Sequence, residues 1–330
     1  MRAAVVGLGW WGKVMIRSLA GNKRISVTHG VDSAPGPVAE FAARHGVTLI
    51  DDFDVALADQ SIDAVILTVP NSLHEPMLRK ALAAGKQVFC EKPLALDVAS
   101  ARRMIEACEK AGVVLGMGHE RRWEPAMQEV SRALKSGAIG RPLQVEANFS
   151  HSVFGALDAG SWRFDPREMP GAGYLGRGIH LTDFLVWLFG PASEVSAITS
   201  TLASEPPKAD TVFARITLEG GVTALISVLT TTPFYGRFTV YGDRGWIEAR
   251  EPGNAEHDEP AEVIICDADR KRTVSTHRSL PIVALNIEAW VDAVEGRAAY
   301  PVTPAQILAN MQIFEAVVRS SETGQPVRIT

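Results

Sequence analysis

The first residues of this chain that could do chemistry are the glycines of Gly7-Leu8-Gly9-Trp10-Trp11-Gly12. They directly follow an apolar run at residues 3–6 and match the G-x-G-x-x-G pattern found where a strand leads into a helix. In that setting, Gly7 permits a tight turn, Gly9 lets backbone approach a pyrophosphate, and Gly12 lets the helix pack on the sheet. The helix expected over residues 11–19 would direct its first N–H groups at the phosphates. The pattern predicts a dinucleotide site, with an ordinary glycine-rich turn as the alternative.

An acidic residue stands where such a site needs one. Asp32 ends the apolar run of residues 25–31 and lies 20 residues after Gly12. At this offset a carboxylate accepts hydrogen bonds from the adenosine ribose, and its charge repels a 2′-phosphate. Asp32 therefore favours NAD over NADP, and the alternative is an ordinary turn residue.

Apolar runs alternate with helical patterns over the first third of the chain. Strands are expected at residues 3–6, 25–31, 64–69, 87–90 and 113–117, with helices that include 37–45, 73–84 and 98–110. Continuously apolar runs predict strands covered on both faces, which is typical of a doubly wound parallel sheet. We therefore expect an α/β dinucleotide-binding domain over residues 1–120.

After residue 120 the runs become longer and partly alternating. Strands are expected at residues 143–150, 195–202, 212–218, 222–229, 238–241 and 263–266, and helices at 125–135, 179–189, 282–295 and 305–323. Glu219-Gly220-Gly221 and Gly242-Asp243-Arg244-Gly245 are typical of hairpin turns. These patterns predict a second domain over residues 121–330, built on a large and mostly antiparallel sheet.

Length and composition limit the classes of protein. A chain of 330 residues with 46% hydrophobic residues can bury two cores. The net charge of −5 and the scattered basic pairs argue against nucleic-acid binding, and no uncharged run is long enough for a membrane span. Only Met1 and Arg2 precede the first expected strand, so we expect no signal peptide and a cytoplasmic location. Cys90, Cys108 and Cys266 lack metal-like spacing and are expected to be reduced and mostly buried.

Five motifs, taken in order, make the chain resemble the Gfo/Idh/MocA oxidoreductases. They are GLGWWG at residues 7–12, TVPNSLH at 68–74, CEKPL at 90–94, RWEP at 122–125 and GIHLTD at 178–183. The resemblance implies a Rossmann domain that binds NAD(P), followed by an open-faced α/β domain whose sheet often mediates dimers or tetramers. It also implies oxidation or reduction of a sugar, an inositol or a derivative at one carbinol carbon.

By position, the resemblance assigns catalysis to Lys92 and His180. Hydride transfer from a carbinol also requires removal of the hydroxyl proton, so the site needs a base. His180 suits that task because the unperturbed pKa of histidine lies near neutrality. Lys92, beside a cationic nicotinamide, could donate a hydrogen bond to the oxygen or share the proton transfer. In relatives Pro93 commonly follows a cis peptide, which is a means of aiming Lys92.

Other positions carry over to the cofactor. They are Trp10, Trp11, Val69, Pro70, Asn71, His74, Glu91, Lys92, Pro93, Arg122, Trp162 and Arg163. Asn71 and His74 match the region near the nicotinamide ribose, although His74 could equally be a residue that starts a helix. Trp162 and Arg163 resemble a recurrent Trp-Arg pair near the nicotinamide end.

One departure from the family pattern concerns Gly176 and Arg177. Family members commonly have an aspartate at the position of Gly176, four residues before the histidine, and an apolar residue at the position of Arg177. Loss of the carboxylate and gain of a guanidinium favour an anionic substrate, such as a uronic acid or a sugar phosphate. Alternatively, Arg177 points outward into solvent or a subunit contact. Asp183 would share a helix face with His180 and either binds substrate or serves as a structural hydrogen-bonding group.

Two other functions stay open at this point. The missing aspartate would suit a dinucleotide-binding regulator without turnover, although Lys92 and His180 argue against it. A lyase, isomerase or glycosidase could instead reduce NAD transiently and then regenerate it. The cluster His119-Glu120-Arg121 has metal-binding residue types, but neighbours at a strand end point in different directions. We therefore expect no metal.

Overall fold

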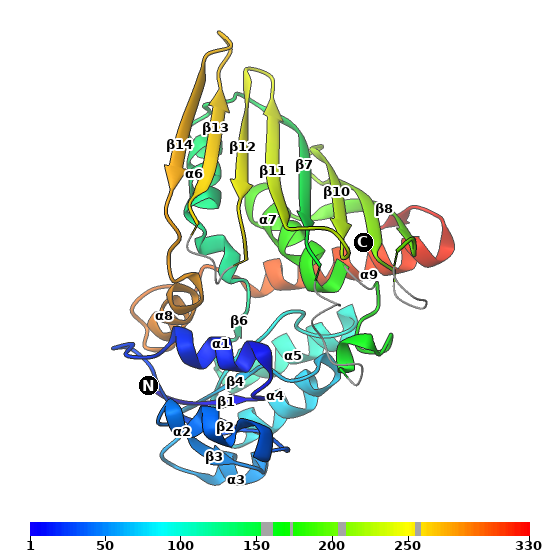
Figure 1. The fold of residues 1–330 in the computed structure, drawn as a ribbon. Coiled ribbons are helices and arrows are strands. Elements are labelled where there is room, and N and C mark those ends of the chain that lie inside the picture. The colour runs from blue at the N-terminus through cyan, green and yellow to red at the C-terminus, as the bar shows by residue number, and fades with distance from the viewer. Residues whose placement is uncertain (153–160, 172–173, 204–208, 255–258) are drawn as a thin grey trace. The chain divides into compact units, whose positions relative to one another are not determined.

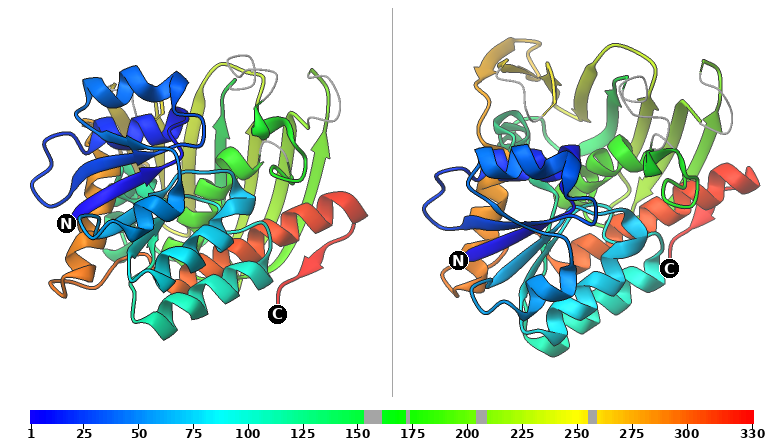
Figure 2. Two further views of the ribbon diagram at one scale, coloured as in Figure 1. Left: turned by 90° about the horizontal axis from the view of Figure 1, so that it is seen from below. Right: turned by 60° about the horizontal axis from the view of Figure 1, so that its bottom comes forward.

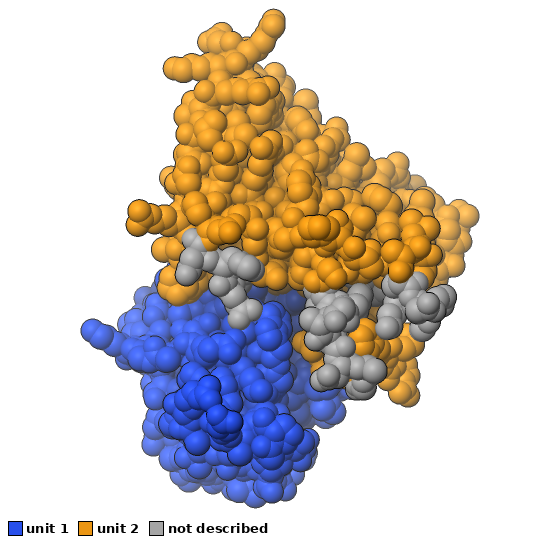
Figure 3. Space-filling model, in the orientation of Figure 1, with its two compact units in different colours: residues 1–120, 283–307 blue, residues 121–282, 308–330 orange. Residues whose placement is uncertain are grey.

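The structure, a computed structural model, describes residues 1–152, 161–171, 174–203, 209–254 and 259–330. It divides into two compact units, which Figure 3 shows in different colours. The first comprises residues 1–120 and 283–307, and the second comprises residues 121–282 and 308–330. Within the described ranges, no helix has the length and apolar character needed to cross a membrane.

A six-stranded parallel sheet forms the first unit, with strand order β3-β2-β1-β4-β5-β6. The strands are β1 (Arg2–Val6), β2 (Ser26–Val31), β3 (Thr48–Ile50), β4 (Ala64–Leu67), β5 (Gln87–Cys90) and β6 (Gly116–Met117). Every residue of β4 is buried, as expected of a strand covered on both faces. The order reverses between β1 and β4, which is the topology of a doubly wound dinucleotide-binding sheet. The predicted α/β fold of this part is confirmed.

Helices follow the strands of this sheet. They are α1 (Trp10–Ser18), α2 (Ala39–Arg44), α3 (Phe53–Ala58), α4 (His74–Ala83) and α5 (Val98–Ala111). The sequence encodes their ends locally: the Asp97 carboxylate accepts from Ser100 N at 2.7 Å to cap α5, and Gly112, at φ 65°, ends that helix. The short elements β3 and α3 have no counterpart among the runs identified in the sequence, because stretches of three and six residues show too little periodicity.

Helix α8 (Ile282–Val294) belongs mainly to the first unit, although the two-domain expectation placed it in the second half of the chain. Its Trp290 is fully buried, with the ring centroid 5.6 Å from that of Phe89 on β5. The indole Nε1 donates to Val114 O at 2.9 Å. Ile287 joins the same core cluster. The chain therefore returns to the first unit at α8, after β14, and the last strand of the second sheet, β15, follows later in the sequence.

A nine-stranded sheet forms the second unit, with order β14-β13-β12-β11-β7-β10-β9-β8-β15. The strands are β7 (Pro142–Ser150), β8 (Ala192–Ser200), β9 (Thr211–Leu218), β10 (Thr223–Leu229), β11 (Tyr235–Gly242), β12 (Gly245–Glu251), β13 (Ala261–Cys266), β14 (Arg272–His277) and β15 (Val327–Arg328). All neighbours are antiparallel except β7 and β10. The two predicted hairpins are confirmed, since β9 pairs with β10 and β11 with β12. Figures 1 and 2 show this sheet beside its helices.

Burial alternates along these strands, so that one face of the sheet packs on helices. The helices are α6 (Pro125–Lys135), α7 (Ile179–Phe189) and α9 (Pro304–Thr323). Helix α6 contacts β12 and β13, and α7 contacts β7. On β10, Ala224, Ile226 and Val228 are buried while Leu225 is exposed. The cysteines are all buried and free, as predicted.

Candidate functional site

The turn between β1 and α1 shows why two of its glycines are required. Gly7 has φ 89°, and a Cβ on it would lie 2.9 Å from Thr68 O. A Cβ on Gly12 would lie 2.1 Å from Gly7 O, which no side chain tolerates. Gly9 differs, because no described atom lies within 4 Å of the corresponding position. The turn is thus tightly packed at both ends and open in the middle, where the N-terminus of α1 begins.

Asp32 follows β2 and supports this turn. Its Oδ2 accepts from Leu8 N at 2.8 Å, and its Oδ1 accepts from Ala34 N at 2.9 Å. The carboxylate therefore fixes the backbone of the glycine turn. Each carboxylate oxygen can accept a second hydrogen bond, so these contacts leave Asp32 able to bind a hydroxyl group as well.

His74, at the start of α4, is buried and joins two loops of the first unit. Its Nδ1 lies 2.9 Å from Pro93 O, and its Nε2 lies 3.2 Å from Val69 O. The ring thereby connects the loop after β4 with the loop after β5. Asn71, in the same loop, is also buried. His74 is the first residue of α4, and both of its ring nitrogens face backbone oxygens. A contact of His74 with a cofactor stays a prediction.

Glu91 and Lys92 follow β5. Glu91 is fully enclosed, and burial, with the nearby charge of Glu120, raises its pKa to about 7, although the Trp11 indole and Lys92 oppose the rise. Its Oε2 accepts from Lys92 N at 3.2 Å. Lys92 is half-buried, and the peptide bond between Lys92 and Pro93 is cis. This loop places an ionisable carboxyl group directly beside the lysine.

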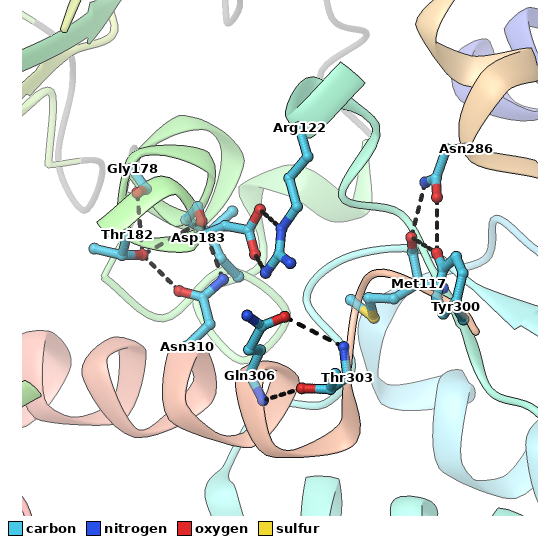
Figure 4. Close-up of polar contacts among 11 residues, drawn as sticks. Met117, Arg122, Gly178, Thr182, Asp183, Asn286, Tyr300, Thr303, Gln306 and Asn310 are labelled. Atoms are coloured by element: carbon cyan, nitrogen blue, oxygen red, sulfur yellow. Dashed lines mark hydrogen bonds and ion pairs between the residues drawn. The ribbon is translucent and has the colours of Figure 1, made fainter. Parts of the chain in front are cut away.

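In the second unit, a π-helical turn (Tyr174–Gly178) leads into α7. A buried chain of hydrogen bonds holds it in place: Tyr174 Oη donates to Thr182 Oγ1 at 2.9 Å, and Thr182 Oγ1 donates to Asn310 Oδ1 at 2.7 Å. Asn310 Nδ2 donates in turn to Ile179 O at 3.1 Å. Figure 4 shows Asn310 beside Thr182. A Cβ on Gly178 would lie 2.3 Å from the Tyr174 ring, so a side chain is excluded there. Turns of this type often occur at functional sites.

His180 and Asp183 lie one helical turn apart on α7, and both are buried. Arg122 binds the Asp183 carboxylate along one edge of its guanidinium, with Nε–Oδ2 and Nη2–Oδ1 distances of 2.8 and 2.6 Å (Figure 4). The His180 ring centroid lies 6.1 Å from that of Phe149 on β7. The structural alternative for Asp183 is therefore realised as a buried ion pair, and a contact of Asp183 with substrate stays a prediction.

Arg177 lies in the π-helical turn and is only 4% exposed. The idea that it points outward into solvent is wrong, because the turn directs its side chain into the protein. Its Nε and Nη2 atoms are buried and have no hydrogen-bond partner among the described residues. Burial lowers the pKa of its guanidinium to about 10.

A small cavity beside His180 brings in residues that the sequence did not indicate. Arg121, Glu124 and Glu251 line it together with Phe149. Arg121 Nη1 lies 2.5 Å from Glu124 Oε1. The guanidinium carbon of Arg121 lies 4.2 Å from the centroid of the Phe149 ring, over its face. Burial raises the pKa of Glu251, and Arg121 opposes that rise. Glu251 stands at the end of β12, and no local motif connects it with His180.

Trp162 and Arg163 contact each other in a short 3-10 turn (Trp162–Phe164), where the guanidinium carbon lies 4.4 Å from the Trp162 ring centroid. Burial lowers the pKa of Arg163. Among the residues described, there is no group of histidine, cysteine and acidic side chains arranged to hold a metal ion.

Comparisons with known proteins find matches for both parts of the chain. Residues 1–119 match the model of an oxidoreductase family with an NAD-binding Rossmann fold, and residues 127–248 match the GFO/IDH/MocA C-terminal domain. The chain is 29% identical over 300 residues to 1,5-anhydro-D-fructose reductase of Ensifer adhaerens, covering 88% of this chain and 87% of that protein. It is 29% identical over 344 residues to inositol 2-dehydrogenase 1 of Saccharopolyspora erythraea, covering 100% and 96%.

The fold has solved counterparts. The crystal structure of an aldose-aldose oxidoreductase from Caulobacter crescentus superposes with a TM-score of 0.88 at 22% identity, covering 100% of this chain and 99% of that one. At this identity the likeness concerns the fold.

Proposed function

The chain belongs to the Gfo/Idh/MocA family of oxidoreductases, and we propose that it transfers a hydride between NAD and a carbinol carbon of a sugar, polyol or sugar acid. The observation that carries this proposal is the glycine turn, closed at Gly7 and Gly12 and open at Gly9. The relatives described above are named as a reductase and a dehydrogenase of carbohydrate-like compounds, which supports the substrate class.

The residues of the first unit fit a dinucleotide. The open space at Gly9 and the N-terminus of α1 suit a pyrophosphate, because backbone N–H groups there lack partners within the helix. Asp32 would bind the ribose hydroxyls with the acceptor capacity that Leu8 and Ala34 leave over. Its charge favours NAD, with NADP the less favoured alternative. The remaining residues proposed to contact the cofactor are Trp10, Trp11, Val69, Pro70, Asn71, His74, Glu91, Lys92 and Pro93 in the first unit, and Arg122, Trp162 and Arg163 in the second.

Lys92 and His180 are the proposed proton-transfer groups. Their task is to hold or accept the hydroxyl proton of the substrate while its carbon is oxidised, and to return it in the opposite direction. The Arg122–Asp183 pair fixes one turn of α7 next to His180, so that the imidazole is held on a rigid element. Arg177 and Asp183 are the further residues proposed to contact substrate.

The second sheet is proposed to mediate assembly into a homodimer or homotetramer. Ile198 on β8 and Phe213 on β9 are directly opposite each other, and Leu225 lies nearby on the same face of β10. All three are large apolar residues that are exposed to solvent. A contiguous exposed apolar patch of this kind is typical of a protein–protein interface. Light scattering of the wild type and of Phe213→Glu tests this surface, because a monomeric wild type would contradict it.

A substrate panel tests the proposed reaction. Polyols, aldoses, uronic acids and sugar phosphates are incubated with the protein and NAD or NADH, and the absorbance of reduced nicotinamide is followed. Net change with at least one compound supports a dehydrogenase. Product formation without net change would instead indicate transient reduction of NAD in a lyase, isomerase or glycosidase. Tight NADH binding without any product would indicate the regulator.

A further inference from the structure

Arg177 differs from the other buried arginines of the described chain. Arg121, Arg122 and Arg177 are each at most 5% exposed. Arg121 pairs with Glu124, and Arg122 pairs with Asp183. Within the described ranges, no carboxylate lies within ion-pair distance of Arg177, and its Nε and Nη2 have no hydrogen-bond acceptor. The molecule therefore contains one enclosed guanidinium whose counter-charge is not supplied by the described part of the chain.

This arrangement has a cost that a ligand could offset. Burial lowers the pKa of Arg177 to about 10, so the group is still charged at neutral pH. A buried charge without a partner destabilises a protein, and arginines inside proteins are accordingly paired. An anion bound to Arg177 would recover that free energy as binding affinity.

The atoms of Arg177 that lack acceptors indicate the shape of the anion. They are Nε and Nη2, which form one edge of the guanidinium. Arg122 uses the same edge to bind Asp183, with each nitrogen donating to a different carboxylate oxygen. The Arg122–Asp183 pair therefore shows which ligand this edge of a guanidinium favours, namely a planar carboxylate held by two parallel hydrogen bonds.

The surroundings of Arg177 suit an anion as well. Gly176, next to Arg177, has no side chain, and no described atom lies within 4 Å of a Cβ placed on it. The hydrogen bonds through Tyr174, Thr182 and Asn310 hold the turn rigidly.

We propose that Arg177 is a specificity residue that binds the carboxylate of a sugar-acid substrate along its Nε–Nη2 edge. This inference rests on the proposed function, because it names the class of carbohydrate that the enzyme takes. The proposal predicts that the enzyme prefers uronic or aldonic acids to the corresponding neutral sugars. His180, three residues further along, is the proton-transfer group of the same segment.

Binding to the NADH-loaded full-length protein tests the proposal without turnover. D-glucuronate, D-glucuronamide, D-glucose and D-glucose 6-phosphate are titrated by calorimetry into the wild type, Arg177→Met and Arg177→Lys. We expect glucuronate to bind the wild type about 10- to 100-fold more tightly than glucuronamide, which has a neutral amide of the same shape in place of the carboxylate. Arg177→Met should abolish that preference. Arg177→Lys should recover only part of it, because a lysine lacks the planar fork. Equal affinity for glucuronate and glucuronamide, or stronger binding of the phosphate ester, would overturn the proposal.

Thermal unfolding provides a second measurement. Because the described chain supplies no counter-charge, Arg177→Met should raise the melting temperature of the ligand-free protein by about 2 °C or more. Arg167→Met is the matched control, since Arg167 is exposed and paired with Asp165, and it should leave melting temperature and glucuronate affinity unchanged. A lower melting temperature of ligand-free Arg177→Met would show that a carboxylate of the chain already neutralises Arg177 and would contradict the proposal.

Turnover separates this inference from the proposed function. If neutral sugars alone change the nicotinamide absorbance, the dehydrogenase stands and the carboxylate site fails. If glucuronate binds in an Arg177-dependent manner but no compound of the panel reacts, the carboxylate site stands and the dehydrogenase fails.

Discussion

Arg122 holds the Asp183 carboxylate by two parallel hydrogen bonds of 2.8 and 2.6 Å, with the two side chains 3% and 2% exposed. Asp183 lies one turn after His180 on α7. Arg122 lies in the 3-10 turn Glu120–Trp123, which precedes α6. A single ion pair thus joins the segment that carries the proposed base to a separate element of the second unit.

Breaking this pair on one side should destabilise the protein strongly. Asp183→Asn removes the negative charge but keeps the shape, which leaves the Arg122 guanidinium buried without its counter-charge. We expect a loss of about 3–5 kcal/mol in the free energy of unfolding, measured by urea titration. The double variant Arg122→Met/Asp183→Asn should recover part of that loss, because it removes both charges.

The exposed pair of Arg215 and Glu194 is the matched control. Its atoms lie 2.8 Å apart, but the side chains are 51% and 31% exposed. Arg215→Met should therefore cost less than about 1 kcal/mol. A similar loss in the free energy of unfolding for the two pairs would contradict the strong stabilisation assigned to the buried pair of Arg122 and Asp183.

The glycine turn allows a prediction that separates folding from binding. A Cβ on Gly12 would overlap Gly7 O, so Gly12→Ala should destabilise the protein by about 3 kcal/mol. Gly9→Ala meets open space and should cost less than about 1 kcal/mol. If a pyrophosphate approaches there, Gly9→Ala should still raise the Kd of NADH by about tenfold or more. Unchanged NADH affinity in this variant would argue against the dinucleotide at Gly9.

The sequence alone predicted much of this fold because the signals were local. The bounds of α7 follow from a helical pattern between Gly178 and Gly190, and the hairpin between β9 and β10 follows from Gly220 and Gly221. The return of α8 to the first unit was not predictable in the same way. Its apolar pattern shows that Trp290 must be buried but not that Phe89 would cover it. Edge strand β14 was missed because most of its side chains are polar or exposed.

The candidate site shows the same limit. Lys92 and His180 stand in motifs and were found from the resemblance, whereas Glu251 lines the cavity beside His180 only because β12 and α7 are neighbours in space. Arg177 was found by its departure from the family pattern. Its burial could not be known, since a π-helical turn leaves no clear periodicity in five residues.

Asp32 should control the choice between NAD and NADP. The wild type should bind NADH more tightly than NADPH, because the carboxylate would repel a 2′-phosphate. Asp32→Asn retains an oxygen acceptor for the turn but removes the charge, so the difference between the two dissociation constants should shrink. Fluorescence titration measures both. Asp51→Asn, at an exposed position, is the control, and tighter NADPH binding by the wild type would refute the assignment.

Proton transfer should be separable from cofactor binding. Lys92→Met and His180→Ala should each lower kcat by about 10²–10⁴-fold, the usual contribution of a general acid or base. The Kd of NADH should change little, because help with proton transfer is separable from affinity for the cofactor. Lys80→Met, which removes an exposed lysine paired with Asp54, should leave kcat unchanged. Near-normal turnover in either proposed catalytic variant would show that another group moves the proton.

The buried carboxyl group of Glu91 should make stability depend on pH. Burial and Glu120 raise its pKa to about 7, from 4.5 for an ordinary glutamate. The folded protein therefore holds a proton that the unfolded chain has lost between these two values. Stability from this group is fully present below about pH 4.5 and is lost as the pH rises toward 7, by up to about 3 kcal/mol. Urea unfolding of the ligand-free protein at several pH values measures the loss. Glu91→Gln, which is neutral throughout, should flatten the profile in that window. Glu75→Gln should not, because Arg103 and Arg79 lower the pKa of Glu75, so that this group titrates below the window. A wild-type profile that rises from pH 4.5 to 7 and is unchanged by Glu91→Gln would show that this carboxyl group is ionised in the folded protein.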